Sequence, residues 1–582
     1  MAIGARLWFV LVILTSLACS TQAPPSPAAL SQETGSARPG DGPTPSADQS
    51  RPLVIAVGRA PESLGAKPLR RLSGPGNPRT ALRAFNAGLV LHDDREQPRP
   101  YLAESLPQLD TDSWRVFPDG TMETTYRLRP DLAWHDGAPL TADDFTFAWR
   151  VYASPELGVA GSPPMSFIQE VRAQDARTVA IRWRQLYGDA DDLQDADFAA
   201  LPRHILESAF AQQSGDAFVA HPYWVTEYVG LGPYRLARYE LGAFIEGEAF
   251  GGHVAGRPRI DRIRVVFIGD ANTAIANLLS GAVHIAVDSS VPQDQALFLQ
   301  REWAPTGAGI VLSSPARVRA AHFQLRPEFS NPRAILDARV RKAVASSTDR
   351  QTIADALTEG QGQAADTFLL PQAEFYAAAE QVQTKYPYDL RQAERYFNEA
   401  GFAKGPDGVY ASAAQGRFSL QVATTDANIT EGTVLAHVLQ QAGIDSSLRI
   451  ISRAESSNDS LAFHTYSGLL TGGLSQPYLP PIMRFRAAEI PRPETRNMGG
   501  NFPGFNHPEF ERLVAAYEGS LNRAERNRYA VDMVKLISEE VPAYGLEYSL
   551  QFVPYTVKLR GPMSTVSLDT GSWNLHEWFW ID

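Results

Sequence analysis

The feature that most constrains the fold of this chain is its single cysteine, Cys19, near the amino end of 582 residues. One thiol forms no internal disulfide and no thiolate metal cluster, so buried apolar side chains must hold the folded structure together. A chain of this length exceeds what one hydrophobic core usually serves, and we therefore expect several lobes. Hydrophobic residues make up 44% and charged residues 20%, values typical of a globular body.

The residues before Cys19 predict an export signal. Arg6 is followed by an apolar run over residues 7–14 and by small or apolar residues at 15–18. This order predicts a signal peptide over residues 1–18, because the apolar run is too short to span a bilayer. A cysteine directly after the cut resembles the bacterial lipobox, although Ser16 stands where leucine is usual. We expect a lipid on Cys19; the alternative is an ordinary signal peptide with an incidental cysteine.

Residues 19–51 are rich in Pro, Ser, Ala, Gly, Thr and Gln and hold almost no large apolar side chain. Such a stretch buries too little surface to offset its ordering entropy. We therefore expect a disordered tether between the lipid and a folded body. The formal net charge of -12 excludes a cationic footprint for nucleic acid, and it argues against a membrane surface bound through basic residues.

Strand and helix patterns alternate along the body without an internal repeat. A β-branched run at residues 53–57 predicts a buried strand, and a Thr141 cap with acids in the first turn predicts a helix. Further strands are expected at residues 124–128 and 260–268, and further helices at 271–280, 339–357, 390–400, 431–442 and 523–540. The pattern predicts a mixed α/β protein with several lobes.

Six segments match motifs of one family in the same order along the chain. The most distinctive is residues 126–144, which follow the pattern LRxxxxWxDGxPLTAxD. The others lie at residues 100–105, 230–234, 278–286, 340–350 and 393–402. Leu231 and His284 depart from the threonine and aspartate usual at their positions. On these motifs the body resembles the extracytoplasmic solute-binding proteins of family 5, which include oligopeptide-, dipeptide- and nickel-binding components of ABC importers.

The resemblance implies an α/β fold of the type II periplasmic-binding-protein architecture. Its ligand cleft would lie between two large lobes, with an extra lobe inserted into the first. The expected lobes are lobe I at residues 52–80, 226–310 and 545–582, the inserted lobe II at 81–225, and lobe III at 311–544.

The resemblance also implies a function. The protein would bind peptides or peptide-like solutes by hinge closure and deliver them to an ABC permease and its ATPase. We expect a monomer without cofactor, metal, nucleic-acid partner or catalytic activity. Its expected location is the outer face of the cytoplasmic membrane, on the cell surface or in the periplasm, held by the lipid on Cys19.

Enzyme motifs are weak in this sequence. The loop at residues 74–78 lacks the Lys-Ser/Thr pair of a phosphate-binding loop, and neither an H-E-x-x-H helix nor a G-x-S-x-G elbow occurs. Two alternatives stay open: a secreted hydrolase, either a glycosidase or a peptidase, and a ligand sensor without transport.

The expected ligand contacts lie in several segments. Peptide-binding relatives often capture the ligand's ammonium group with an aspartate in a loop of lobe III, but the matching stretch, residues 469–478, contains no acid. Glu62 is the candidate substitute, and Arg484 (or Arg486) is the candidate partner of a carboxylate. The remaining residues of the predicted ligand-binding set are Tyr466, Thr471, Gln476, Asn501 and Trp573.

Overall fold

The computed structural model describes residues 51–67, 69, 78–157, 160, 164–371, 373–452, 455, 464–474, 481–492, 499–565 and 571–581. All of them belong to one of the two units into which the chain divides, residues 47–582. The predicted signal peptide, Cys19, the predicted tether as far as residue 50 and the predicted ligand-binding residue Gln476 lie outside the described residues.

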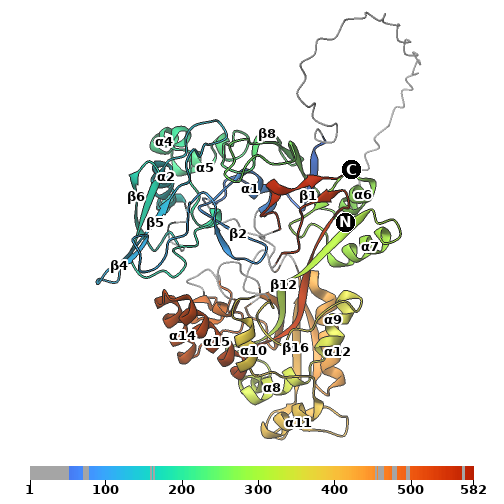
Figure 1. The fold of residues 1–582 in the computed structure, drawn as a ribbon. Coiled ribbons are helices and arrows are strands. Elements are labelled where there is room, and N and C mark those ends of the chain that lie inside the picture. Colours follow the sequence, from blue (N-terminus) through green and yellow to red (C-terminus); the bar gives the residue numbers. More distant parts are fainter. Residues whose placement is uncertain are drawn as a thin grey trace, which may run out of the picture. The chain divides into compact units, whose positions relative to one another are not determined.

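One mixed sheet of ten strands is the largest element of the fold (Figure 1). Its strand order is β17-β16-β18-β12-β19-β11-β1-β10-β9-β8, so strands far apart in the sequence are neighbours. The bounds are β1 Leu53–Val57, β8 Tyr234–Glu240, β9 Phe244–Ala249, β10 Arg262–Phe267, β11 Ile285–Ala286, β12 Gly309–Phe323, β16 Ser419–Thr425, β17 Asp445–Ile451, β18 Leu469–Leu474 and β19 Ala543–Thr556. With the helices below, this sheet confirms the predicted α/β class.

The long strands β12 and β19 connect the two ends of this sheet. They pair antiparallel from Gly309 opposite Thr556 to His322 opposite Ala543. The register shifts twice: between Pro315 and Arg317, where β12 has one extra residue, and between Arg319 and Ala320, where β19 has one. β19 supplies side chains to four separate cores: Tyr555, Phe552, Tyr548 and Leu546 each pack in a different one. Figure 1 shows β12 running from the elements around β1 to those around β16.

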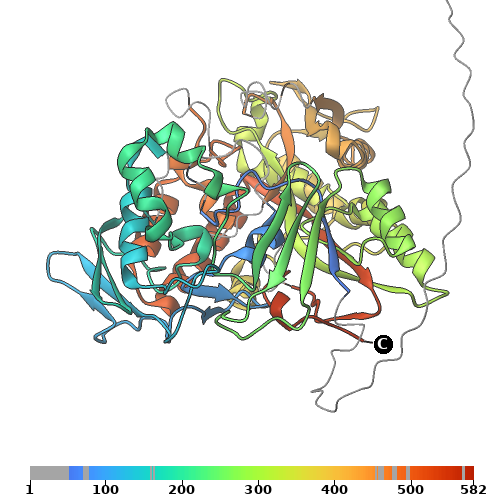
Figure 2. The same cartoon turned by 90° about the horizontal axis from the view of Figure 1, so that it is seen from above.

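At the β1 end, the sequence forms buried parallel strands. β1 is a run of apolar residues because it lies inside the sheet, parallel to β10 on one side and to β11 on the other. Figure 2 shows β1 in blue beside the green strands β8 to β10. The helices at this end are α1 Arg79–Phe85, α6 Ala271–Ser280 and α7 Gln293–Trp303. α7 packs against both β12 and β19.

A second sheet of four antiparallel strands, in the order β4-β5-β7-β6, lies within residues 114–183. The bounds are β4 Trp114–Val116, β5 Met122–Arg127, β6 Ile168–Asp175 and β7 Thr178–Trp183. Its neighbours are β2 Val90–His92, β3 Pro98–Pro100, α2 Ala142–Tyr152, α3 Asp195–Phe198, α4 Arg203–Gln212 and α5 Gly215–Val219. α2 packs on β6 and β7, and this region shares one core with β1 and β10.

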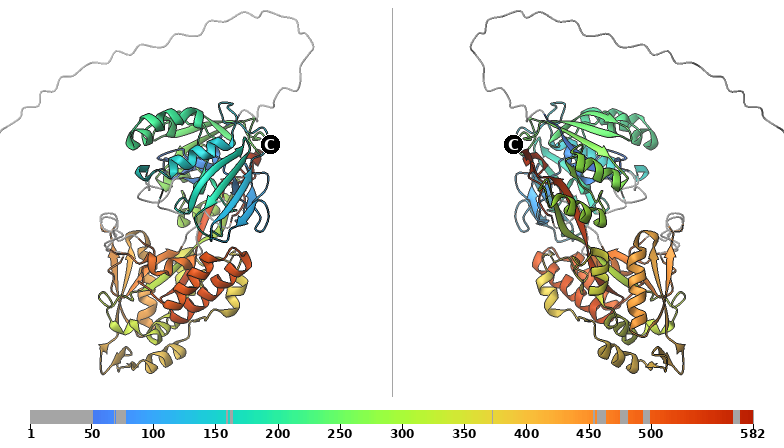
Figure 3. Two further views of the ribbon diagram at one scale, coloured as in Figure 1. Left: turned by 90° about the vertical axis from the view of Figure 1, so that its left-hand side faces the viewer. Right: turned by 90° about the vertical axis from the view of Figure 1, so that its right-hand side faces the viewer.

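Two cores surround the β16 end of the large sheet. One includes side chains of α8 and α12, and the other includes those of α14 and α15. Figure 3 shows α14 and α15 side by side in orange-red. The bounds are α8 Ala338–Ser346, α9 Arg350–Thr358, α10 Tyr376–Val382, α11 Leu390–Glu399, α12 Ile429–Gln441, α14 Pro508–Gly519 and α15 Arg523–Glu540.

Short elements complete the described chain. The three-stranded sheet β13-β14-β15 and the pair β20-β21 are separate from the large sheet. Their bounds are β13 Ala403–Lys404, β14 Tyr410–Ser412, β15 Gly416–Arg417, β20 Leu559–Arg560 and β21 Phe579–Trp580. The 3-10 turns are Pro155–Leu157, Pro222–Trp224, Arg333–Leu336, Asp426–Asn428, Pro481–Phe485, Ala487–Glu489 and Leu575–Glu577.

The motif at residues 126–144 builds a turn and a helix start. Trp134 is buried, and Gly137 has a φ of +90°, which only glycine adopts without strain. The backbone N–H of Thr141 donates to Oδ2 of Asp144 at 2.9 Å, as in a capping box, and α2 begins at the next residue. The helix predicted from the Thr141 cap is therefore confirmed.

Most predicted helices are confirmed, but the single helix predicted over residues 339–357 is wrong. The structure has two helices there, α8 and α9, separated by residues 347–349. Asp349 causes the break, because its side chain accepts the backbone N–H of Thr352 and caps the new helix.

Arg341 and Arg350 are held mainly by hydrogen bonds to backbone carbonyls. Arg341 donates to the carbonyls of Glu540 and Val541 at the end of α15, while its ion pair with the Glu540 carboxylate is longer, at 3.7 Å. Asp349, between them, caps α9. These arginines join α8 and α9 to the chain around β19.

The predicted division into lobes stays a prediction. Its boundaries at 310/311 and 544/545 fall inside β12 and β19, which run through both ends of the large sheet. Contacts also link segments that the prediction assigns to different lobes. Asp189 pairs with Arg526 of α15 at 2.6 Å, and Gln293 of α7 donates to the carbonyl of Leu357 in α9 at 2.7 Å.

Candidate functional site

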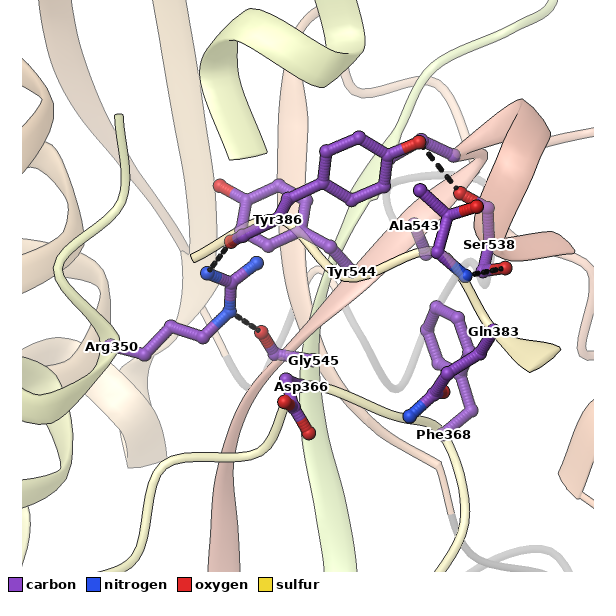
Figure 4. A pocket seen from close by; sticks show the side chains of 11 residues that line it. Arg350, Asp366, Phe368, Gln383, Tyr386, Ser538, Ala543, Tyr544 and Gly545 are labelled. Carbon is purple, nitrogen blue, oxygen red and sulfur yellow. Dashed lines mark hydrogen bonds between the residues drawn. The ribbon is translucent and has the colours of Figure 1, made fainter. Parts of the chain in front are cut away.

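A pocket beside β19 is lined by polar groups, several of which hydrogen-bond within the protein (Figure 4). Nε of Arg350 donates to the carbonyl of Gly545 at 2.8 Å, and Nη1 donates to the carbonyl of Tyr386 at 2.7 Å. The hydroxyl of Tyr386 donates to the carbonyl of Ser538 at 3.0 Å. These hydrogen bonds connect α9, α15 and β19. Because the polar groups already have partners within the protein, we do not assign a ligand to this pocket.

Two residues of the predicted ligand-binding set are buried and bonded to the backbone. The hydroxyl of Tyr466 donates to the carbonyl of Phe323 at 3.0 Å, and its ring is fully buried. The amide of Asn501 donates to three carbonyls and accepts the N–H of Phe505. In the described structure both side chains hold loops in place.

Two others meet at β18. Thr471 Oγ1 lies 2.8 Å from Thr424 Oγ1 on the neighbouring strand β16. Nη1 of Arg484 donates to the carbonyl of Gly473 at 3.0 Å, and its guanidinium stands 5.6 Å from the ring centre of Phe502. The structure therefore brings Thr471 and Arg484 to one strand, directly before the undescribed residues 475–480.

Glu62 lies near the amino end of the described chain, and Trp573 lies near its carboxyl end. Glu62 is exposed in the segment that follows β1. Trp573 is half-buried, and its Nε1 is buried without a hydrogen-bond partner among the described residues. Whether these residues contact a ligand stays a prediction.

A charged cluster that sequence reasoning missed lies where β12, β19 and α12 meet. Nε of Arg319 donates to Oε1 of Glu431 at 3.2 Å, and its Nη2 donates to Oε2 of the same carboxylate. Only 13% of the Arg319 side chain and 2% of the Glu431 side chain are exposed. Glu431 lies in the first turn of α12, where the positive end of the helix dipole favours a carboxylate.

Glu547 completes this group, which we call the Arg319 cluster: Arg319, Glu431 and Glu547. Glu547 lies directly opposite Arg319 in the β12–β19 pairing and is 4% exposed. Its Oε2 is buried and has no hydrogen-bond partner among the described residues. Burial, followed by the nearby Glu431 carboxylate, raises the pKa of Glu547 to about 7 despite the attraction of Arg319.

The strand β18 passes close to the Arg319 cluster. A Cβ atom on Gly473 would stand 3.4 Å from Nη1 of Arg319 and 3.7 Å from Cδ of Arg317. The backbone that carries Thr471 and accepts from Arg484 therefore also lies against the cluster. Arg317 and Arg319 both lie between the two register shifts of the β12–β19 pairing.

The sequence held one signal for this cluster. Glu547 is the only charged residue in the strand β19, and a charge in a largely buried strand is usually paired or functional. Its partners were not visible in the sequence, because Arg319 is 228 positions away.

The described residues offer no ready metal site. No group of three or more His, Cys, Asp or Glu side chains placed to hold a metal occurs among them. His322, on β12, is fully buried, and burial together with Arg484 and Arg319 lowers its pKa to about 3. The imidazole is therefore neutral at physiological pH.

Comparison with known proteins places the chain in a class. The family model of bacterial extracellular solute-binding proteins, family 5 Middle, matches residues 98–486. That match covers more than half of the chain, so the class is that of the bacterial extracellular solute-binding proteins. The chain belongs to family 5 of this class, as the sequence motifs predicted.

Individual relatives are distant but align over long stretches. The chain is 21% identical over 501 residues to the oligopeptide-binding protein AppA of Bacillus subtilis. This alignment covers 84% of this chain and 85% of AppA. The structure of that AppA with a nonapeptide has 19% identity and a TM-score of 0.65, covering 91% of this chain and 99% of AppA. NikZ from Campylobacter jejuni, in complex with Ni(L-His), has 21% identity and a TM-score of 0.68, covering 90% and 99%.

At these identities the solved structures establish the fold alone. Several other curated relatives are matched over only 56% of their length. Among the described residues, no helix combines the length and the apolar character needed to cross a bilayer.

Proposed function

We propose that this protein is the solute-binding component of an ABC importer and takes up peptides or peptide-like solutes. The observation that carries the proposal is the family match over residues 98–486. Relatives named as oligopeptide-binding proteins support a peptide ligand. An ABC permease and its ATPase are the proposed partners. We propose a monomer without catalytic activity, which leaves the hydrolase and the sensor as the alternatives to be tested.

We propose that the protein closes around its ligand by bending at β12 and β19. These two strands are the central pair that joins the ends of the sheet, and the register of their pairing shifts at Pro315/Arg317 and at Arg319/Ala320. Such irregularities locally break the ladder of hydrogen bonds and bend a strand. A hinge needs only a few residues of this kind at the end or the junction of an element.

The test of solute binding is thermal denaturation of the purified protein with panels of peptides, sugars and metal ions. A peptide that raises the melting temperature progressively with its concentration supports the proposal, because a ligand that binds only the folded state stabilises it by mass action. Each peptide that stabilises the protein is then incubated with it and examined by mass spectrometry. An intact peptide is the expected result, and cleavage would instead establish the hydrolase.

We also propose that a lipid on Cys19 anchors the protein to the outer face of the cytoplasmic membrane. The short apolar run before Cys19 and the polar stretch after it support this location. Cys19→Ser removes the thiol that would be acylated. We expect the variant to leave the membrane fraction and to lose incorporation of labelled fatty acid, whereas equal membrane retention of both forms would contradict the anchor.

A further inference from the structure

Two parts of the described structure have separate hydrophobic cores. β1, β7 and β10 share one core, and we call the elements around it the β1 body. Two other cores surround the β16 end of the large sheet, and we call the elements around them the β16 body. β12 and β19 run through both bodies, and they are the strands at which we propose that the hinge bends. A contact between the bodies outside these strands would therefore change when the hinge moves.

Asp189 and Arg526 form such a contact. Asp189 follows β7 in the β1 body, and its Oδ1 lies 2.6 Å from Nη1 of Arg526, near the start of α15 in the β16 body. Nη2 of Arg526 donates to the hydroxyl of Tyr517 on α14 at 3.1 Å, and the guanidinium lies 4.5 Å from the centre of the Tyr517 ring. The side chain of Arg526 is 12% exposed and that of Asp189 is 37% exposed, so water screens the ion pair only in part.

Two further features fit the bodies together at this point. Gly188 lies so close to Arg526 that a Cβ atom on this glycine would stand 2.7 Å from Nη1. Leu521 comes from the turn between α14 and α15, yet it packs against the core of the β1 body, as Tyr187 does. An apolar side chain of the β16 body thus reaches the core of the other body, close in sequence to the helix start that carries Arg526.

A second contact between the bodies lies beside the hinge strands. Gln293 of α7 donates to the carbonyl of Leu357 in α9, and these helices pack on the strands themselves, α7 on β12 and β19 and α9 on β19. Figure 1 shows α15 to the left of β12 and α9 to its right. The Asp189–Arg526 pair instead joins the segment after β7 to α15. Because the pair is formed when the bodies are together, it must separate when the hinge moves them apart.

We infer that Asp189 and Arg526 form a latch that holds the two bodies together in the closed form and thereby sets the affinity for the solute. This inference rests on the proposed function and adds to it two positioning residues, which act through closure and not through contact with the solute. Closure brings the carboxylate of Asp189 to the guanidinium that Tyr517 holds, and it brings Leu521 onto the core of the β1 body. An ion pair with this geometry is directional, so it favours one angle of the hinge.

The latch has a thermodynamic signature. A solute that binds the closed form has an apparent affinity that depends on how readily the protein closes. Loss of the latch lowers the equilibrium constant of closure by one factor, so it weakens the binding of every solute by that same factor. The association rate should change little, because the latch forms after the solute has bound, and the dissociation rate should rise.

The test measures affinity by titration calorimetry and dissociation rates by stopped-flow tryptophan fluorescence, with oligoalanines of two to nine residues as probes. Arg526→Met and Asp189→Asn each remove one charge of the latch. We expect both variants to weaken every oligoalanine that binds the wild type by about tenfold, and to release it faster. The double variant should lose no more than either single variant, because all three remove the same interaction.

A further variant and a matched control complete the set. Gly188→Ala keeps both charges but places a methyl group against Nη1 of Arg526, and it should also weaken binding. Arg512→Met is the control, because Arg512 is an exposed arginine of α14 whose partner, Glu509, lies in the same helix. This control removes the same charge from the same body and should bind as the wild type does. Circular dichroism checks that each variant is folded.

The outcomes are distinct. Unchanged or tighter binding in Arg526→Met and Asp189→Asn would overturn the latch and leave solute binding intact, even where the melting temperature of the free variants falls. A loss that differs from one oligoalanine to another would show contact with the solute, and an equal loss in Arg512→Met would show a general effect of charge; either result overturns the latch. Failure of every oligoalanine to bind the wild type would overturn the proposed function and this inference with it.

Discussion

At the scale of single residues, buried polar side chains are of two kinds: some hydrogen-bond to the backbone and hold loops, and others have a polar atom without a hydrogen-bond partner among the described residues. Tyr466 and Asn501 suit a ligand site by residue type, yet their polar atoms are bonded to backbone groups. Glu547 was not in the predicted ligand-binding set, yet its Oε2 is buried and has no hydrogen-bond partner among the described residues. We therefore choose candidate ligand contacts in this protein by whether a polar atom has a hydrogen-bond partner, and not by residue type.

Glu547→Gln should change how stability depends on pH. The folded-state pKa of about 7 lies above the ordinary value of 4.5, so the stability that Glu547 contributes is fully present below pH 4.5 and is lost as the pH rises through 7. The gap between these pKa values corresponds to about 3 kcal/mol. Urea unfolding without ligand should show the variant gaining that much on the wild type between pH 4.5 and 8. Parallel curves would contradict the raised pKa.

Arg319→Met should destabilise the protein strongly. It removes the guanidinium from Glu431, which is 2% exposed, and leaves an uncompensated buried charge at a cost of about 3 to 5 kcal/mol. Adding Glu431→Gln should recover most of the loss, because the double variant buries one charge fewer. A double-mutant cycle measured by urea unfolding checks this coupling. Additive effects of the two substitutions would show that the pair is not coupled.

At the scale of elements, the sequence predicts a helix or strand well when neighbouring residues, such as a cap or a terminal glycine, mark its start and end. α6 has the predicted bounds, residues 271–280, and ends at Gly281, whose φ is +74°. α15 also has its predicted bounds. The break between α8 and α9 escaped prediction because helical periodicity continues across it. The second helix starts where the carboxylate of Asp349 accepts the backbone N–H and the hydroxyl of Thr352.

The start of α2 depends on Asp144 rather than on its neighbour. Asp144 accepts the backbone N–H of Thr141 at 2.9 Å and that of Arg203 at 3.0 Å. Asp144→Ala leaves both donors unsatisfied and should cost about 2 to 4 kcal/mol of stability. The exposed Asp143 is the control, and Asp143→Ala should stay within about 0.5 kcal/mol. Equal losses in thermal unfolding would refute this role of Asp144.

At the scale of the whole molecule, the sequence motifs predicted the family and the fold class, and both are confirmed. The candidate site was less predictable. The Arg319 cluster depends on the pairing of β12 with β19, two strands more than 200 residues apart in the sequence. The residues of either strand alone do not predict which residues of the other lie opposite them. Two predicted residues do lie together: Thr471 is in β18, and Arg484 donates to the carbonyl of Gly473 in the same strand.

The central claim is that the protein binds a solute and closes by bending at β12 and β19. Small-angle X-ray scattering of the purified protein, with and without the peptide that raises its melting temperature most, tests this claim directly. We predict that the radius of gyration falls when the peptide saturates the protein and returns when the peptide is removed. An unchanged radius of gyration at saturation would contradict closure by this hinge.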